Sequence, residues 1–219
     1  MGSLIFFDIN GTIIKRDHRT DIPYQKAIDI FLNTQNGMDG VDTSARSDKD
    51  VFMEVLDNHN TYFSEGKWLK FLKIYEEQLE AFRKTDVWRA NVDSVDIIQK
   101  LSKTNHKLSL ITGELSIGAR YKLEKLGVWK YFATGGFGED GLRRFDIAKS
   151  ALEKVKSLYS DGYENMYVIG DTILDIKTAR HLGAKIISIT TGSNTKEELI
   201  KENPDYIIDC FEEIEHLFL

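Results

Sequence analysis

Short apolar runs alternate with segments of helical spacing along most of this 219-residue chain. The runs are short for helices and most are rich in isoleucine or aromatic residues, which is typical of buried strands. They are Leu4–Phe7, Leu108–Ile111, Tyr167–Ile169, Ile186–Ile189 and Tyr206–Ile208. Amphipathic segments at 94–103, 116–127, 146–158 and 173–183 separate the later runs. This alternation predicts an α/β fold: a Rossmann-like parallel sheet with helices on both faces.

The region from residue 17 to residue 86 interrupts the alternation. Three segments with helical spacing, 24–34, 48–58 and 66–84, follow one another there with no convincing strand between them. An insertion at a surface loop is tolerated when its two ends lie close together. We therefore expect an α/β core domain formed by residues 1–16 and 87–219, and an inserted α-helical cap domain at 17–86.

The overall charge limits the classes of partner. The formal net charge is −6 and no apolar stretch approaches the roughly 20 residues of a membrane helix, so we expect no nucleic-acid or membrane binding. A local basic pocket for a small anionic molecule remains compatible with this charge. The single cysteine, Cys210, and the lack of a recognisable signal peptide favour a cytoplasmic location. We expect a monomer or a homodimer.

Polar residues follow several of the expected strands, and in a parallel sheet the carboxyl ends of the strands form the binding edge. They are Asp8, Asn10, Thr112, Gly113, Asp171 and Asp175, with Arg143 and Arg144 preceding the helix at 146–158. Carboxylates are hard oxygen ligands that suit Mg²⁺, while a hydroxyl, backbone N–H groups and an arginine suit phosphoryl oxygens. A carboxylate can also attack phosphorus. The pattern therefore favours phosphoryl chemistry at this edge.

These residues resemble the four motifs of the haloacid dehalogenase (HAD) superfamily. The motifs are "DINGT" at 8–12, "TG" at 112–113, an arginine before a helix, and "GDTILDI" at 170–176. Their order and spacing match along the whole chain, and the inserted helices are similar to the C1-type cap of the phosphoglycolate-phosphatase-like branch. The resemblance implies a hydrolase: a Mg²⁺-dependent phosphatase that acts on a small phosphorylated metabolite through an aspartyl-phosphate.

The resemblance also implies a role for each matching residue. Asp8 would be the nucleophile and a Mg²⁺ ligand, and Asn10 would offer its backbone carbonyl to the metal. Thr112 and the Gly113 N–H would bind phosphoryl oxygens. Arg144, or Arg143 if the register shifts by one, would pair with the nucleophile and the phosphoryl group. Asp171 would be a metal ligand, Asp175 a ligand or an anchor for the ligands, and Arg46 in the cap a candidate for binding the distal part of the substrate.

Asn10 is the main departure from the family pattern, which has aspartate there. That aspartate exchanges protons with the leaving group and with the attacking water, and an amide cannot do so at neutral pH. We expect turnover to fall by roughly a hundred- to ten-thousand-fold, with metal and phosphate binding retained. Three explanations stay open: an introduced substitution that traps a bound state, a naturally weak or specialised phosphatase, and a catalytically silent binding or regulatory protein on the same scaffold.

Two further residues have weaker patterns. Glu114 stands where the branch usually has asparagine, and a carboxylate beside a phosphate site is unfavourable unless it faces the cap, a cation or a donor group of the substrate. We expect Glu114 to point to solvent and to cap the next helix. Ser193, ahead of Glu197, is expected to cap the helix that follows it.

Overall fold

The structure is a computed structural model that describes residues 2–43 and 46–219. In these residues the strands form a six-stranded sheet in the order β3-β2-β1-β4-β5-β6, and every neighbouring pair is parallel. The strands are β1 (Leu4–Phe7), β2 (Lys107–Ile111), β3 (Thr134–Gly136), β4 (Met166–Gly170), β5 (Lys185–Ile189) and β6 (Tyr206–Ile208). The predicted α/β class with a parallel sheet is confirmed.

The edge strand β3 is the one that the sequence pattern did not predict. Its residues, "TGG", carry no apolar side chain, so hydrophobic periodicity gives no signal there. Pairing with β2 and close packing on a helix define it. A Cβ on Gly136 would lie 2.3 Å from the backbone oxygen of Ile147, so only glycine allows this approach of strand and helix.

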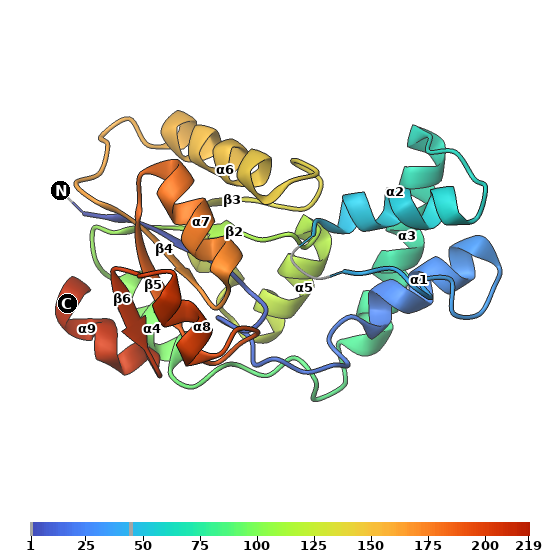
Figure 1. The fold of residues 1–219 in the computed structure, drawn as a ribbon. Helices are drawn as coiled ribbons and strands as arrows, with labels where there is room; N and C mark the ends of the chain where they lie inside the picture. The colour runs from blue at the N-terminus through green and yellow to red at the C-terminus, as the bar shows by residue number, and fades with distance from the viewer. Residues whose placement is uncertain (1, 44–45) are drawn as a thin grey trace.

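Helices cover both faces of the sheet (Figure 1). Apolar side chains of α4 (Ser94–Leu101), α5 (Ser116–Lys125) and α9 (Glu215–Phe218) pack on one face, together with the short 3₁₀ helices Trp129–Tyr131 and Phe211–Ile214. Side chains of α6 (Arg144–Leu158), α7 (Ile173–Leu182) and α8 (Lys196–Lys201) pack on the other. Burial on both faces explains why the central strands are continuous apolar runs.

The remaining helices, α1 (Ile22–Leu32), α2 (Asp48–Asn58) and α3 (Glu65–Phe82), stand to one side of the sheet (Figure 1). They share an apolar cluster of their own, centred on Phe52 and Phe71, whose rings stack with centroids 4.4 Å apart. The segments that lead to and from these helices run together: Lys15 N–H donates to Arg89 O at 2.9 Å. The division into core and cap at residues 17 and 86 stays a proposal that agrees with this packing.

Among the described residues, no helix has the length and apolar character that a membrane crossing requires.

Candidate active site

Three buried carboxylates meet at the carboxyl edge of the sheet. Asp8 follows β1, Asp171 follows the neighbouring strand β4, and Asp175 lies in the first turn of α7. One oxygen from each of the three lies within 4.8 Å of the others. Parallel pairing of β1 and β4 brings the first two together, because the two strands end at the same level.

Asp175 has its two oxygens committed in different directions. Oδ2 accepts a hydrogen bond of 3.1 Å from the N–H of Thr172, which completes a capping box at the start of α7. Oδ1 accepts one of 2.6 Å from Arg144. Asp175 therefore holds both the helix start and the arginine in place.

Arg144 joins the carboxylates to helix α6. A single nitrogen, Nη2, donates to Asp8 Oδ1 at 2.7 Å and to Asp175 Oδ1 at 2.6 Å. The buried Nε of Arg144 has no hydrogen-bond partner among the described residues. Arg143 instead lies exposed and pairs with Asp146 of its own helix. Of the two arginines, the fold brings Arg144 to the site and turns Arg143 away from it.

The carboxylate group carries more negative charge than Arg144 balances. Burial, together with Asp175 and Asp171, raises the pKa of Asp8 to about 8 in spite of Arg144. Burial and Asp175 raise the pKa of Asp171 to about 6. Such shifts indicate a site that favours an additional cation.

Asp171 has two partners that the sequence analysis did not identify. The hydroxyl of Thr12 donates to Oδ1 at 3.1 Å, and the Ser193 N–H donates to Oδ2 at 2.6 Å. The expectation that Ser193 caps the following helix is wrong, because Thr195 caps α8 and forms a capping box with Glu198. Thr195 precedes the helix directly, so it can reach the free N–H groups of the first turn, whereas Ser193 lies two residues further back.

Thr112 and Gly113 lie at the end of β2, in contact with the cap. Gly113 O accepts a hydrogen bond of 2.8 Å from Asp48 N–H at the start of α2. A Cβ on Gly113 would lie 2.3 Å from the backbone oxygen of Arg46, so this approach requires glycine. Within the part of the chain that the structure describes, nothing accepts a hydrogen bond from Gly113 N–H. That group is therefore available to a ligand.

Arg46 reaches the cavity but is already paired. Its guanidinium bonds to Asp50 at 2.7 Å and to Glu54, both on α2, and to Asp42 O at 3.1 Å. The charge of Arg46 is therefore neutralised within the cap, and its role toward a substrate stays a prediction.

Glu114 does not point to solvent, and the expectation that it caps the next helix is wrong. Its side chain is 6% exposed and forms an ion pair with the buried Lys122 of α5. The N–H of Ser116, in the first turn of α5, is instead bound by Glu139. The lysine explains the difference, because a buried carboxylate is tolerated when it is paired.

The sequence analysis did not identify Lys122 as a residue near the site, although its position in the helical pattern indicated that it is buried. It belongs to the buried stripe of α5 with Gly118, Ala119 and Leu123, where a charged residue requires a partner. Its Nζ also donates to Asn10 Oδ1 at 3.2 Å. Asn10 is thereby connected through Lys122 to Glu114.

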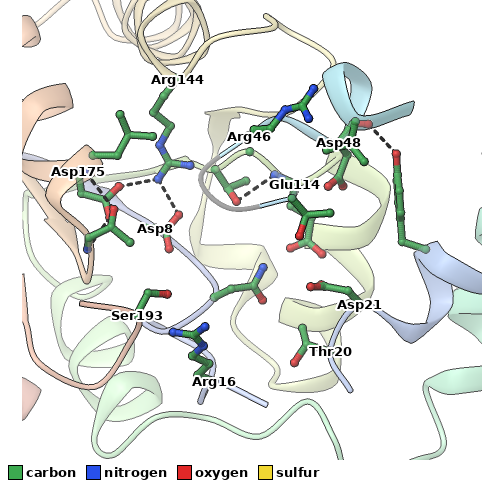
Figure 2. A pocket seen from close by; sticks show the side chains of 18 of the residues that line it. Asp8, Arg16, Thr20, Asp21, Arg46, Asp48, Glu114, Arg144, Asp175 and Ser193 are labelled. Atoms are coloured by element: carbon green, nitrogen blue, oxygen red, sulfur yellow. Dashed lines mark hydrogen bonds and ion pairs between the residues drawn. The ribbon is translucent and has the colours of Figure 1, made fainter. Parts of the chain in front are cut away.

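A cavity of about 760 Å³ lies between the sheet edge and the cap helices, and most of these groups border it. Figure 2 shows Asp8, Arg144 and Asp175 on one side of the opening, and Asp21, Asp48 and Glu114 on the other. The predicted residues Asn10, Arg46, Thr112 and Gly113 also line it, whereas Asp171 does not line it and has an oxygen within 4.8 Å of an oxygen of Asp8.

Comparison with known proteins finds similarity to hydrolases and phosphatases. The model of the HAD-hydrolase-like family matches residues 145–214. "Putative pyrophosphatase PpaX" of Caldanaerobacter subterraneus is 27% identical over 208 residues, 94% of this chain and 89% of the relative. The phosphoglycolate phosphatase of Agrobacterium fabrum is 30% identical over 117 residues, 53% of this chain and 49% of its own length.

Solved structures share the fold along the full chain. A haloacid dehalogenase-like protein, SP0104 of Streptococcus pneumoniae, has a TM-score of 0.63 at 20% identity and covers 100% of this chain and 99% of its own. A predicted phosphoglycolate phosphatase of Haemophilus somnus has a TM-score of 0.65 at 18% identity, with 99% and 97% covered. The motifs, the fold and the family model over residues 145–214 agree, and the chain is similar to the haloacid dehalogenase-like hydrolases.

Proposed function

We propose that the protein is a Mg²⁺-dependent phosphatase that acts on a small phosphorylated metabolite, with Asp8 as nucleophile. The observation that carries the proposal is the convergence of Asp8, Asp171 and Asp175 within 4.8 Å, bridged by Arg144. The names of the relatives, a pyrophosphatase and a phosphoglycolate phosphatase, support phosphate release as the reaction class.

The donor set fits Mg²⁺. Asp8 and Asp171 are buried oxygen donors whose pKa values are raised by burial and by neighbouring carboxylates, so a divalent cation would relieve their repulsion. Asp8, Asp171 and the backbone carbonyl of Asn10 would hold the ion, with Asp175 anchoring Arg144 and with Thr12 and the Ser193 N–H anchoring Asp171. When bound, Mg²⁺ neutralises charge on the phosphoryl oxygens.

The residues of this chain would bind the phosphoryl group and attack it. Arg144, with its unpaired Nε, the Thr112 hydroxyl and the Gly113 N–H would bind the phosphoryl oxygens. An Asp8 oxygen attacks phosphorus as the bond to the leaving oxygen breaks, which gives an aspartyl-phosphate. Water hydrolyses this intermediate and regenerates Asp8.

Asn10 limits both steps. The leaving oxygen must gain a proton and the attacking water must lose one. An amide can neither donate the first proton nor accept the second at neutral pH. The contact with Lys122 holds the Asn10 side chain in place without adding a base. We therefore propose slow turnover by this sequence, whether Asn10 is natural or introduced.

The asparagine at position 10, beside otherwise complete metal ligands, supports a second candidate function. A chain that keeps the metal ligands and Arg144 but lacks a proton-transfer side chain at position 10 could serve as a phosphate-ligand-binding or regulatory protein. The two functions differ in turnover, because both require the ligand to bind.

One assay pair separates the two functions. Phosphate release from p-nitrophenyl phosphate with Mg²⁺ is measured for the unmodified chain and for Asn10→Asp, with Asp8→Asn as the control for each. Release that depends on Asp8 in either chain supports the phosphatase. If the Asn10→Asp chain is inert across a broad panel of phosphate esters although it binds Mg²⁺, the phosphatase proposal is wrong.

A further inference from the structure

The cap side of the cavity has a chemical character opposite to that of the phosphoryl side. Three carboxylates, Asp21, Asp48 and Glu114, border it there (Figure 2). Lys122 is the cation that pairs with this group, and Arg46 is bound by Asp50 and Glu54. The exposed side chains of Arg16 and Lys177 also reach the cavity, but neither pairs with these carboxylates in the described structure. The cap side therefore holds more carboxyl groups than paired cations, and burial raises the pKa of both Asp48 and Glu114 because no further cation among the described residues balances them.

One oxygen of this group has no hydrogen-bond partner in the part of the chain that the structure describes. Oε1 of Glu114 binds Lys122, whereas Oε2 is buried and has no hydrogen-bond partner among the described residues. A buried carboxylate oxygen without a donor costs free energy, about 1–3 kcal/mol for an unsatisfied buried polar group and more for a charged one. A ligand donor in the cavity would remove this cost.

Asp21 and Tyr75 also border the cavity. Asp21 stands at the N-cap of α1 yet makes no side-chain capping hydrogen bond, so its carboxylate is not used by the helix. The Tyr75 hydroxyl lies beside Glu114: a Cβ on Gly118 would be 2.5 Å from Tyr75 Oη and 3.0 Å from Glu114 Oε1. The small residue Gly118 makes room for both groups.

The arrangement suits an organic cation better than a second metal ion. Among the described residues, the groups of three possible ligands that converge within 4.8 Å are Asp8 with Asp171 and Asp175, and a separate exposed group, Asp93 with Cys210 and Glu212. Asp21, Asp48 and Glu114 do not converge in this way. Carboxylates spread around a space can each accept a hydrogen bond from an ammonium group, which has several donors.

We infer that the substrate is a phosphate monoester whose alcohol part carries an amino group, with the ammonium bound by Glu114 and Asp21 opposite the phosphoryl site. The inference rests on the proposed function, and it specifies the substrate class for that site. Each side of the cavity has one buried polar atom without a hydrogen-bond partner among the described residues: Arg144 Nε on the phosphoryl side and Glu114 Oε2 on the cap side. An anionic distal group such as a carboxylate would meet the repulsion of the cap-side acids.

The linker between the two charged ends is short. Glu114 lies two residues after Thr112, and two residues span at most about 7 Å of backbone. Lys122, which pairs with Glu114, also bonds to Asn10, two residues after Asp8. We therefore use two carbon atoms between the phosphate oxygen and the amine as the length of the first probe.

The test measures affinity, so that it does not depend on turnover. Calorimetry with Mg²⁺ uses the full unmodified chain, in which Asn10 keeps the consumption of the esters slow and the proposed metal ligands are intact. The probes are 2-aminoethyl phosphate, 2-hydroxyethyl phosphate, ethyl phosphate, phosphoglycolate and inorganic phosphate. We expect the amine to bind roughly ten- to a hundred-fold more tightly than the hydroxyl analogue, as hydrogen bonds to charged groups provide. Phosphoglycolate should bind more weakly than both.

Three variants test whether the cap-side carboxylates cause the preference for the amine over the hydroxyl analogue. Glu114→Gln should remove most of the preference for the amine, and Asp21→Asn, at an exposed position that tolerates substitution, should reduce it. Asp57→Asn, an exposed carboxylate of α2 that does not line the cavity, should leave it unchanged. The Asp21 variant keeps the test decisive if Glu114→Gln fails to fold.

The outcomes separate the two proposals. If phosphate and all of the esters bind but the amine has no advantage, the substrate inference is overturned and the phosphatase proposal stands. The same holds if inorganic phosphate binds and 2-aminoethyl phosphate does not. If neither phosphate nor any ester binds in the presence of Mg²⁺, the proposed function fails first and the substrate inference fails with it.

Discussion

Lys122 Nζ donates a hydrogen bond of 3.2 Å to Asn10 Oδ1 and forms an ion pair with Glu114. This contact joins Asn10, which we propose limits proton transfer, to a buried charge pair.

Restoring a carboxylate at position 10 should increase phosphate release. Asn10→Asp supplies a group that can exchange protons, which is worth roughly a hundred- to ten-thousand-fold. We expect a gain near the lower end, because the adjacent Lys122 favours the ionised carboxylate over the acid. Steady-state phosphate release with Mg²⁺ measures the gain, and Asp8→Asn in the Asn10→Asp chain should abolish it. Equal rates for the unmodified chain and the Asn10→Asp chain would contradict this account of Asn10.

Removing Lys122 alone should destabilise the protein strongly. Lys122→Met leaves the Glu114 carboxylate buried without its partner, and breaking a buried pair in this way costs about 3–5 kcal/mol. Urea unfolding measures the free energy. The double variant Lys122→Met/Glu114→Gln should recover much of the loss, whereas Lys149→Met, at an exposed lysine of α6, should change stability little. A double variant no more stable than Lys122→Met would show that the pair is not the cause.

Metal binding should depend on Asp171. Asp171→Asn keeps the size of the side chain but removes the charge that a divalent cation requires, so we expect Mg²⁺ affinity to fall by at least about tenfold, or about 1.4 kcal/mol. Isothermal titration calorimetry measures it. Asp209→Asn, at an exposed carboxylate that pairs with Lys196, is the matched control. Unchanged affinity in Asp171→Asn would remove this residue from the proposed ligands.

Stability of the metal-free protein should fall as pH rises. The native state keeps a proton on Asp171 up to about pH 6 and on Asp8 up to about pH 8, whereas the unfolded chain releases both near their ordinary value of 3.8. The native state therefore binds more protons, and stability is lost at about 1.4 kcal/mol per pH unit for each group that still holds its proton. The dependence should be steeper below pH 6 than between pH 6 and 8.

Denaturant unfolding in EDTA at pH 5, 6, 7 and 8 measures this dependence. Asp8→Asn should remove most of the slope between pH 6 and 8, because asparagine does not titrate there. Saturating Mg²⁺ should flatten the profile and stabilise the protein most at the higher pH values. A metal-free profile that is flat over this range would contradict the raised pKa values of the two carboxylates.

The sequence determined most of the fold and much of the phosphoryl side of the site. Apolar runs such as Leu4–Phe7 are buried on both faces of a parallel sheet, so local composition and spacing were enough to predict them. Asp8 and Asp171 follow two such runs, and the topology of parallel strands brings strand ends together without any knowledge of side-chain contacts. The choice between Arg143 and Arg144 needed the structure, because a shift of one residue in register decides which side chain faces the carboxylates.

Only the tertiary structure decided the character of the cap side. Strand β3 has no apolar pattern and exists through its pairing with β2 and its approach to α6. The expected outward orientation of Glu114 was wrong because its partner, Lys122, lies two helical turns further along α5 and becomes its neighbour only after folding. Local sequence records propensity and periodicity, whereas the position of a buried charge depends on which distant residue can neutralise it.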